Sequence, residues 1–166
     1  MKATRFLLVA ALLGCGERTP TGVTRQAFLL DDPLPVTASG LVRCSPLPPD
    51  AVSQTIGPEG GTLYIGPHRL AIPPGALDAP VEITAIAPAD TVNRVTFGPQ
   101  GLTFQRPASL TMSYANCDAL ASLAPKQIAY TSDALAILEL LPSVDDLLSQ
   151  TVTGQLEHFS DYAIAW

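Results

Sequence analysis

Short runs of apolar residues, bounded by glycine or proline, follow one another along most of the chain. Within each run, apolar and polar positions partly alternate, as they do in a strand that buries one face. The runs recur at the spacing of about 8 to 12 residues that is typical of an antiparallel β-sandwich. We therefore predict an all-β antiparallel sandwich with strands at 62–65, 69–72, 81–86, 94–97, 108–114, 127–130, 136–140, 151–153 with 155–156, and 162–166.

One segment fits a helix better than a strand. Ser143 can cap a helical turn that runs through Val144–Leu148. Asp145 and Asp146 would then lie near the positive end of the helix dipole. We predict a single helical turn here.

The first fourteen residues have the pattern of a bacterial export signal. Lys2 and Arg5 precede the apolar run Phe6–Leu13, which is too short to span a bilayer. The run ends in Leu-Leu-Gly-Cys at Cys15, which resembles a lipobox. We predict that residues 1–14 form a lipoprotein signal peptide and that lipidated Cys15 anchors an exported protein to a membrane of the cell envelope. In a diderm bacterium, Gly16 after the cysteine is compatible with sorting to the outer membrane. An ordinary signal peptide or a buried N-terminal helix is the alternative.

A proline-rich segment follows the lipobox. Residues 15–51 are rich in Pro, Thr, Asp and Ser, and Pro46, Pro48 and Pro49 exclude a regular helix or central strand there. We predict a tether over 15–51 and one sandwich domain over 52–166. The apolar Phe28–Leu30 interrupts the tether and is expected either to dock on the domain or to form a short strand.

The net charge argues against a nucleic-acid partner. Removal of the signal takes away Lys2 and Arg5, so seven basic residues remain against 15 acidic ones and the mature net charge is −8. A surface of this charge repels a phosphate backbone.

Two cysteines remain once Cys15 is lipidated. Cys44 and Cys117 are an even number in an oxidising compartment, which predicts a disulfide between them. Two buried free thiols are the alternative. A metal site is not expected, because no Cys-x-x-Cys pair or histidine cluster accompanies them.

Four motifs, taken in order, resemble a ZU5 domain: Ile56–Thr62, Leu70–Leu77, Phe97–Ala108 and His158–Tyr162. The Ile-Pro-Pro-Gly-Ala-Leu run within the second motif is the most specific, and the resemblance covers about residues 53–166. ZU5 modules are β-sandwiches of ankyrins, netrin receptors and death-domain adaptors, and ZU5-like domains also occur in bacterial surface lipoproteins. The resemblance implies a module that mainly binds other proteins. A purely structural interpretation also holds, in which Ile72 points inward and Ala76 with Leu77 caps the core.

The resemblance also implies a candidate reaction. Some death-domain adaptors cleave themselves inside a His-Phe-Ser motif, and this chain has His158-Phe159-Ser160. Ser160 would be the nucleophile, Phe159 the acyl donor and His158 the base, and these residue types suit the step. In a regular strand, however, Phe159 packs inward while His158 and Ser160 share an exposed or edge face. We prefer this strand interpretation, because cleavage would release only residues 160–166.

Other candidate chemistry is better explained by solvated or structural residues. The acid pairs Asp31-Asp32 and Asp145-Asp146 lack the oxygen-rich loop of a calcium site. A hydrolase built on Ser160 and His158 lacks a Gly-x-Ser-x-Gly elbow. The tyrosines are expected to pack in the core or across strands, and His68 to lie in a turn. We predict no metal, no cofactor and no small-molecule substrate.

The sequence thus favours a non-enzymatic lipoprotein of the cell envelope. Its ZU5-like domain is expected to bind an unknown envelope protein or to serve in structural display. Self-cleavage between Phe159 and Ser160 is the alternative function, and an envelope hydrolase is the third.

Overall fold

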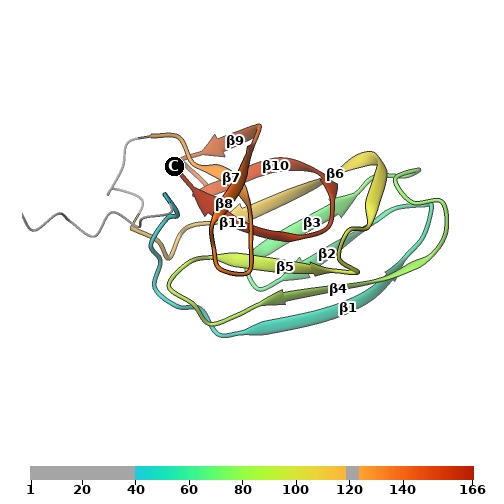
Figure 1. Cartoon of the computed structure of the whole chain (residues 1–166), viewed down its shortest axis with the longest axis horizontal. Helices are drawn as coiled ribbons and strands as arrows, with labels where there is room; N and C mark the ends of the chain where they lie inside the picture. Colours follow the sequence, from blue (N-terminus) through green and yellow to red (C-terminus); the bar gives the residue numbers. More distant parts are fainter. Residues whose placement is uncertain (1–39, 119–123) are drawn as a thin grey trace, which may run out of the picture. The chain divides into compact units, whose positions relative to one another are not determined.

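The computed structural model describes residues 40–118 and 124–166, and these residues form an all-β fold (Figure 1). The predicted signal peptide, Cys15, Phe28–Leu30 and the acid pair Asp31-Asp32 lie outside the described residues. The strands are β1 (Asp50–Ile56), β2 (Gly61–Ile65), β3 (His68–Ile72), β4 (Val81–Ala87), β5 (Arg94–Gly98), β6 (Thr103–Ser113), β7 (Gln127–Thr131), β8 (Ile137–Leu141), β9 (Ser143–Asp146), β10 (Thr151–His158) and β11 (Asp161–Ala165).

The strands form two antiparallel sheets packed face to face. The six-stranded sheet has the order β1-β4-β5-β11-β7-β8, and the five-stranded sheet has the order β2-β3-β6-β10-β9. The predicted antiparallel β-sandwich is therefore confirmed.

The main core lies between the sheets and follows the predicted alternation. β4 shows the pattern clearly, because Ile83 and Ala85 are buried while Glu82, Thr84 and Ile86 are exposed. Aromatic rings fill the centre: Phe159 stacks on Phe97 with ring centroids 5.1 Å apart and meets the edge of Phe104 at 5.0 Å.

Two of the turns that carry the ZU5 resemblance hold each other in place. The Gly75 N–H donates to the Pro58 carbonyl oxygen at 2.8 Å. Gly60 has φ +76°, and a Cβ there would lie 2.4 Å from the Ile72 carbonyl oxygen, so only glycine fits. Ile72, Ala76 and Leu77 are buried in the core, as the structural interpretation predicts.

The folded region begins earlier than the predicted domain start at residue 52. Leu41 is fully buried, and the Val42 N–H donates to the Ile164 carbonyl oxygen at 2.8 Å. β1 already begins at Asp50. Thus residues 40–51, assigned to the tether from their prolines, pack on the sandwich, because apolar Leu41 and Val42 outweigh the prolines that follow.

A small second apolar cluster lies on the outer face of the six-stranded sheet. Ala129, Ala163 and Ala165 alternate with the core residues of β7 and β11, so their side chains point away from the main core. Leu41 and Val92 cover them.

The predicted helical turn at Ser143–Leu148 is wrong. Ser143–Asp146 is strand β9, which pairs with Thr151–Gly154 of β10. The Asp146 carboxylate instead closes the turn that follows, because it accepts the N–H groups of Leu148 and Ser149. The Ser149 side chain first, and then the N–H groups of Ser149 and Leu148, hold the pKa of Asp146 below its usual range.

Candidate functional site

The His158-Phe159-Ser160 motif is a link between the two sheets rather than part of one strand. β10 ends at His158 in the five-stranded sheet and β11 begins at Asp161 in the six-stranded sheet. Phe159 points inward and is 1% exposed, as predicted. The predicted exposed or edge face for Ser160 is wrong, because Ser160 is 7% exposed.

The link is tied down by backbone hydrogen bonds to the β5–β6 turn. The Phe159 N–H donates to the Leu102 carbonyl oxygen at 2.7 Å, and the Gly101 N–H donates to the Phe159 carbonyl oxygen at 3.0 Å. The Phe97 N–H donates to the Ser160 carbonyl oxygen at 3.0 Å. The chain on both sides of the Phe159–Ser160 bond is thus held in one position.

The side chains of the motif do not form a nucleophile–base pair. His158 Nδ1 lies 3.4 Å from the Phe159 carbonyl oxygen, and its ring packs edge-on against Tyr130 at 5.1 Å. Within residues 124–166, no hydrogen bond joins the His158 ring to the Ser160 hydroxyl. The Asp161 carboxylate accepts the hydroxyl of Thr96 and not the His158 ring. A Ser160–His158–Asp161 hydrolase triad is therefore absent from this part of the chain.

The predicted disulfide between Cys44 and Cys117 is present in the structure, with a sulfur–sulfur distance of 2.05 Å. Hydrogen bonds flank it: the Ser45 N–H donates to the Asn116 carbonyl oxygen at 2.8 Å, and the Asp118 N–H donates to the Arg43 carbonyl oxygen at 2.8 Å. The disulfide joins the N-terminal segment to the loop after β6.

Asp145 and Asp146 have structural partners. The Tyr114 hydroxyl donates to Asp145 at 2.6 Å, and the Lys126 N–H donates to the same carboxylate at 2.8 Å. Nowhere in residues 40–118 and 124–166 do three or more His, Cys, Asp or Glu side chains gather as metal ligands would. No helix in the same ranges is long and apolar enough to cross a bilayer.

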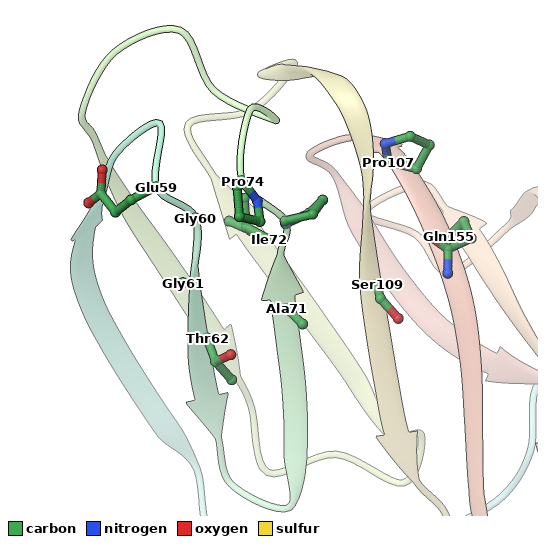
Figure 2. Close-up of a pocket in the computed structure, with 11 residues that line it drawn as sticks. Glu59, Gly60, Gly61, Thr62, Ala71, Ile72, Pro74, Pro107, Ser109 and Gln155 are labelled. Carbon is green, nitrogen blue, oxygen red and sulfur yellow. The ribbon is translucent and has the colours of Figure 1, made fainter.

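A shallow groove of about 420 Å³ crosses the outer face of the five-stranded sheet (Figure 2). Thr62, Ala71 and Ser109 lie in one register row across β2, β3 and β6, and Figure 2 shows the Thr62 and Ser109 side chains on either side of Ala71. Glu59 is the one ionisable residue of the lining. The groove offers the hydroxyl groups of Thr62 and Ser109 and the amide group of Gln155.

The exposed apolar residues concentrate at one lateral side of the sandwich. β8 is the edge of the six-stranded sheet and β9 is the edge of the five-stranded sheet, and only Pro142 separates them. Five of the seven large hydrophobic side chains that are exposed in the described ranges belong to this segment: Leu138 (56%), Leu140 (43%), Val144 (74%), Leu147 (72%) and Leu148 (99%).

Three of these residues are exposed along β8 and β9. Leu140 lies opposite Ala129, whose side chain points away from the main core. In β9, the Ser143 hydroxyl accepts the Ile128 N–H and Asp145 accepts the Tyr114 hydroxyl, so Val144 between them points outward. Leu138 lies at a register irregularity of β8, between the residues paired with Tyr130 and Thr131, and is exposed there. We call Leu138, Leu140 and Val144 the apolar strip. Sequence reasoning missed it because the runs that contain these residues were interpreted as a half-buried strand and a helical turn.

His68 differs from its predicted role, and Tyr64 takes one of its two predicted positions. Tyr64 is 65% exposed, outside the core, and lies across from Arg69 in the β2–β3 pair. His68 is not in a turn but begins β3, where it is 2% exposed and its Nδ1 accepts the Ser113 N–H at 3.1 Å. Burial lowers the pKa of His68 from 6.5 to about 4.

We expect His68 to make the fold acid-sensitive. Its imidazole stays neutral in the folded state down to about pH 4 but becomes protonated in the unfolded chain below about pH 6.5, so the unfolded state binds more protons between these values. The free energy of unfolding should fall on the order of 3 kcal/mol as pH drops through this window. Urea unfolding of wild type and His68→Asn at pH 7 and pH 4.5 measures this loss of stability. The Asn variant is the control, because its side-chain oxygen can still accept the Ser113 N–H but does not titrate. Equal pH dependence in both proteins would rule out His68 as the cause.

Comparison with known families does not assign the chain. No family model matches the sequence, and no curated protein matches it.

Proposed function

We propose that the protein is an exported lipoprotein, anchored to the cell envelope through Cys15, whose ZU5-like sandwich binds another protein or serves in structural display. The apolar strip at the β8–β9 edge is the observation that supports protein binding, and the Leu-Leu-Gly-Cys motif at Cys15 supports the lipid anchor. Edge strands present unpaired N–H and C=O groups, and soluble proteins usually protect them with charged residues, proline or a covering segment. Here the edge presents exposed leucine and valine side chains beside Glu139 and Pro142.

The strip suits a partner that adds a strand to the sheet. Burying one Leu or Val side chain contributes about 1.5–3 kcal/mol relative to leaving it exposed. Backbone hydrogen bonds to β8 would add affinity, and side chains at every second position would contact the strip. An edge of this kind favours binding an extended segment of another protein over turnover of a small substrate.

Position-specific photo-crosslinking in the producing cells tests this function. A photoreactive residue in place of Leu140, at the exposed β8 edge, should give one discrete crosslinked product after irradiation. The matched control is Gln54, an exposed residue of β1, which is the opposite edge of the same sheet. Equal crosslinking at Leu140 and Gln54 would contradict binding through β8. Absence of crosslinking at both positions, in a protein that is folded and attached to the membrane, would contradict it as well.

A second candidate function, self-cleavage at Phe159–Ser160, is favoured by one contact. The Gly101 N–H already donates to the Phe159 carbonyl oxygen, which would carry negative charge after attack by the Ser160 hydroxyl. That attack would break the Phe159–Ser160 peptide bond, form an ester between the Phe159 carbonyl carbon and the Ser160 hydroxyl oxygen, and free the Ser160 amine. Water would then hydrolyse the ester. His158 would have to turn from Tyr130 to accept the hydroxyl proton.

Intact mass under denaturing conditions tests self-cleavage. β11 is paired with β5 and β7 and is wholly buried, so a cleaved C-terminal peptide would stay bound until the fold is denatured. We expect a single uncleaved species, since no base within residues 40–118 and 124–166 makes a hydrogen bond to the Ser160 hydroxyl. Loss of residues 160–166 in wild type but not in Ser160→Ala would show that the chain cleaves itself. The same loss in both proteins would assign the cut to a contaminating protease.

A further inference from the structure

A hollow of about 460 Å³ lies beside β8, next to the start of the apolar strip. Leu138, Tyr130 and Thr131 line it together with Asp133 and Asp161. Within the described ranges, six polar or charged residues are buried, and three of them, Thr131, Ser160 and Asp161, line this one hollow. Polar groups buried together in this way are typical of a binding site, because apolar residues would fill a purely structural position at lower cost.

One buried hydroxyl in the hollow lacks a partner. Thr131 is 1% exposed, and its Oγ1 makes no hydrogen bond to any residue in 40–118 or 124–166. Thr131 lies opposite Asp161 in the β7–β11 pairing, and Asp161 is 8% exposed. Leaving a buried hydroxyl unsatisfied costs about 1–3 kcal/mol, so a ligand that donates a hydrogen bond to it would gain affinity.

The hollow lies in a strongly acidic part of the chain. Residues 127–166 include six Asp and Glu residues and no Lys or Arg. Asp133 and Asp161 line the hollow, and Glu139 is exposed on the adjacent β8. Burial chiefly raises the pKa of Tyr162, and Tyr130, Glu139 and Asp161 raise it further, in line with the closeness of Glu139 and Asp161 to this ring.

We propose that the hollow receives the cationic side chain of a partner segment that pairs along β8. This inference rests on the proposed function and names the chemistry of its partner: an extended strand in which apolar residues lie two positions before and after a basic one, so that all three share one face. The basic group, a guanidinium or an ammonium, donates to the carboxylates of Asp133 and Asp161. The aliphatic part of that side chain packs on Leu138, and the apolar residues two positions away cover the strip.

The charges disfavour a second copy of this chain as the occupant. Two β8 strands paired about a two-fold axis near their centres would bring Glu139 close to its own counterpart, and like charges opposite each other are destabilising. Nothing within residues 127–166 could supply the basic group. Glu139 thus acts against self-association and in favour of a basic partner.

Peptide binding to the full chain in its Cys15→Ser form tests the inference. The probes are the peptide TVTRTVT-amide and its glutamine counterpart TVTQTVT-amide, each with a fluorescent dye at its N-terminus and titrated by anisotropy at low salt; the two valines lie on the same face as the central residue. We expect the arginine peptide to bind about tenfold more tightly, with the preference falling several-fold in Asp133→Asn and on addition of salt. Asp78→Asn, an exposed acid of the β3–β4 loop, is the matched control and should leave the preference unchanged.

The outcomes separate this inference from the proposed function. Equal binding of the two peptides would overturn the basic-side-chain inference while binding through the β8 edge stands. Failure of both peptides to bind would also overturn it. So would self-association of the chain through β8, detected by gel filtration. Crosslinking at Leu140 decides the edge function independently of these results.

Discussion

Removal of the Cys44–Cys117 disulfide is expected to lower the free energy of unfolding by about 4 kcal/mol. The bond closes a loop with a sequence separation of 73 residues, and the chain entropy it removes from the unfolded state sets this magnitude. It also holds the segment that places Leu41 over the outer alanine cluster. A loss of this size is a large part of the net stability of a single domain.

Urea unfolding measures the effect in three samples: oxidised wild type, reduced wild type and the double variant Cys44→Ala/Cys117→Ala. The reduced protein and the double variant should unfold at similarly low urea concentrations, and a reductant should not change the double variant further. A wild-type protein whose midpoint does not move on reduction would show that the disulfide adds no stability.

The strands of the sandwich could be predicted where alternation alone decides their burial. β4 and β6 have one face in the core, so their apolar positions identify both the strand and its inward side. β9 could not be predicted in this way, because its burial pattern has no core residue and its inward Asp145 is satisfied by Tyr114, which is distant in sequence. Pairing with β10 overrides the local helical preference of Ser143–Leu148.

The candidate site, like β9, could be predicted only in part from the local sequence pattern. Composition and the resemblance identified His158-Phe159-Ser160, and the pattern correctly predicted that Phe159 packs inward. The step from one sheet to the other at Phe159 and Ser160 depends on hydrogen bonds to Gly101, Leu102 and Phe97, which no local pattern contains. The hollow beside β8 likewise combines residues from four separate stretches of the chain, so only the folded structure brings Asp133 and Asp161 together.

Replacing the apolar strip on β8 is expected to abolish assembly with the partner while leaving the fold intact. Leu138→Ser/Leu140→Ser removes two exposed leucines from the edge, so the loss of apolar contact falls on the complex and little on the free domain. Loss of two such side chains from an interface should weaken binding by at least about a hundredfold. Ile86→Ser is the matched control, because Ile86 is 51% exposed on β4 of the same sheet, away from this edge.

The size of the detergent-solubilised assembly is the most direct test of binding through β8. The three proteins are expressed in the producing cells, solubilised gently and separated by native gel filtration, and their thermal unfolding is compared after purification. We predict that wild type and Ile86→Ser elute in a complex larger than the chain alone, and that Leu138→Ser/Leu140→Ser elutes as the free chain with an unchanged unfolding temperature. A double variant that stays folded and still elutes in the complex would contradict the account.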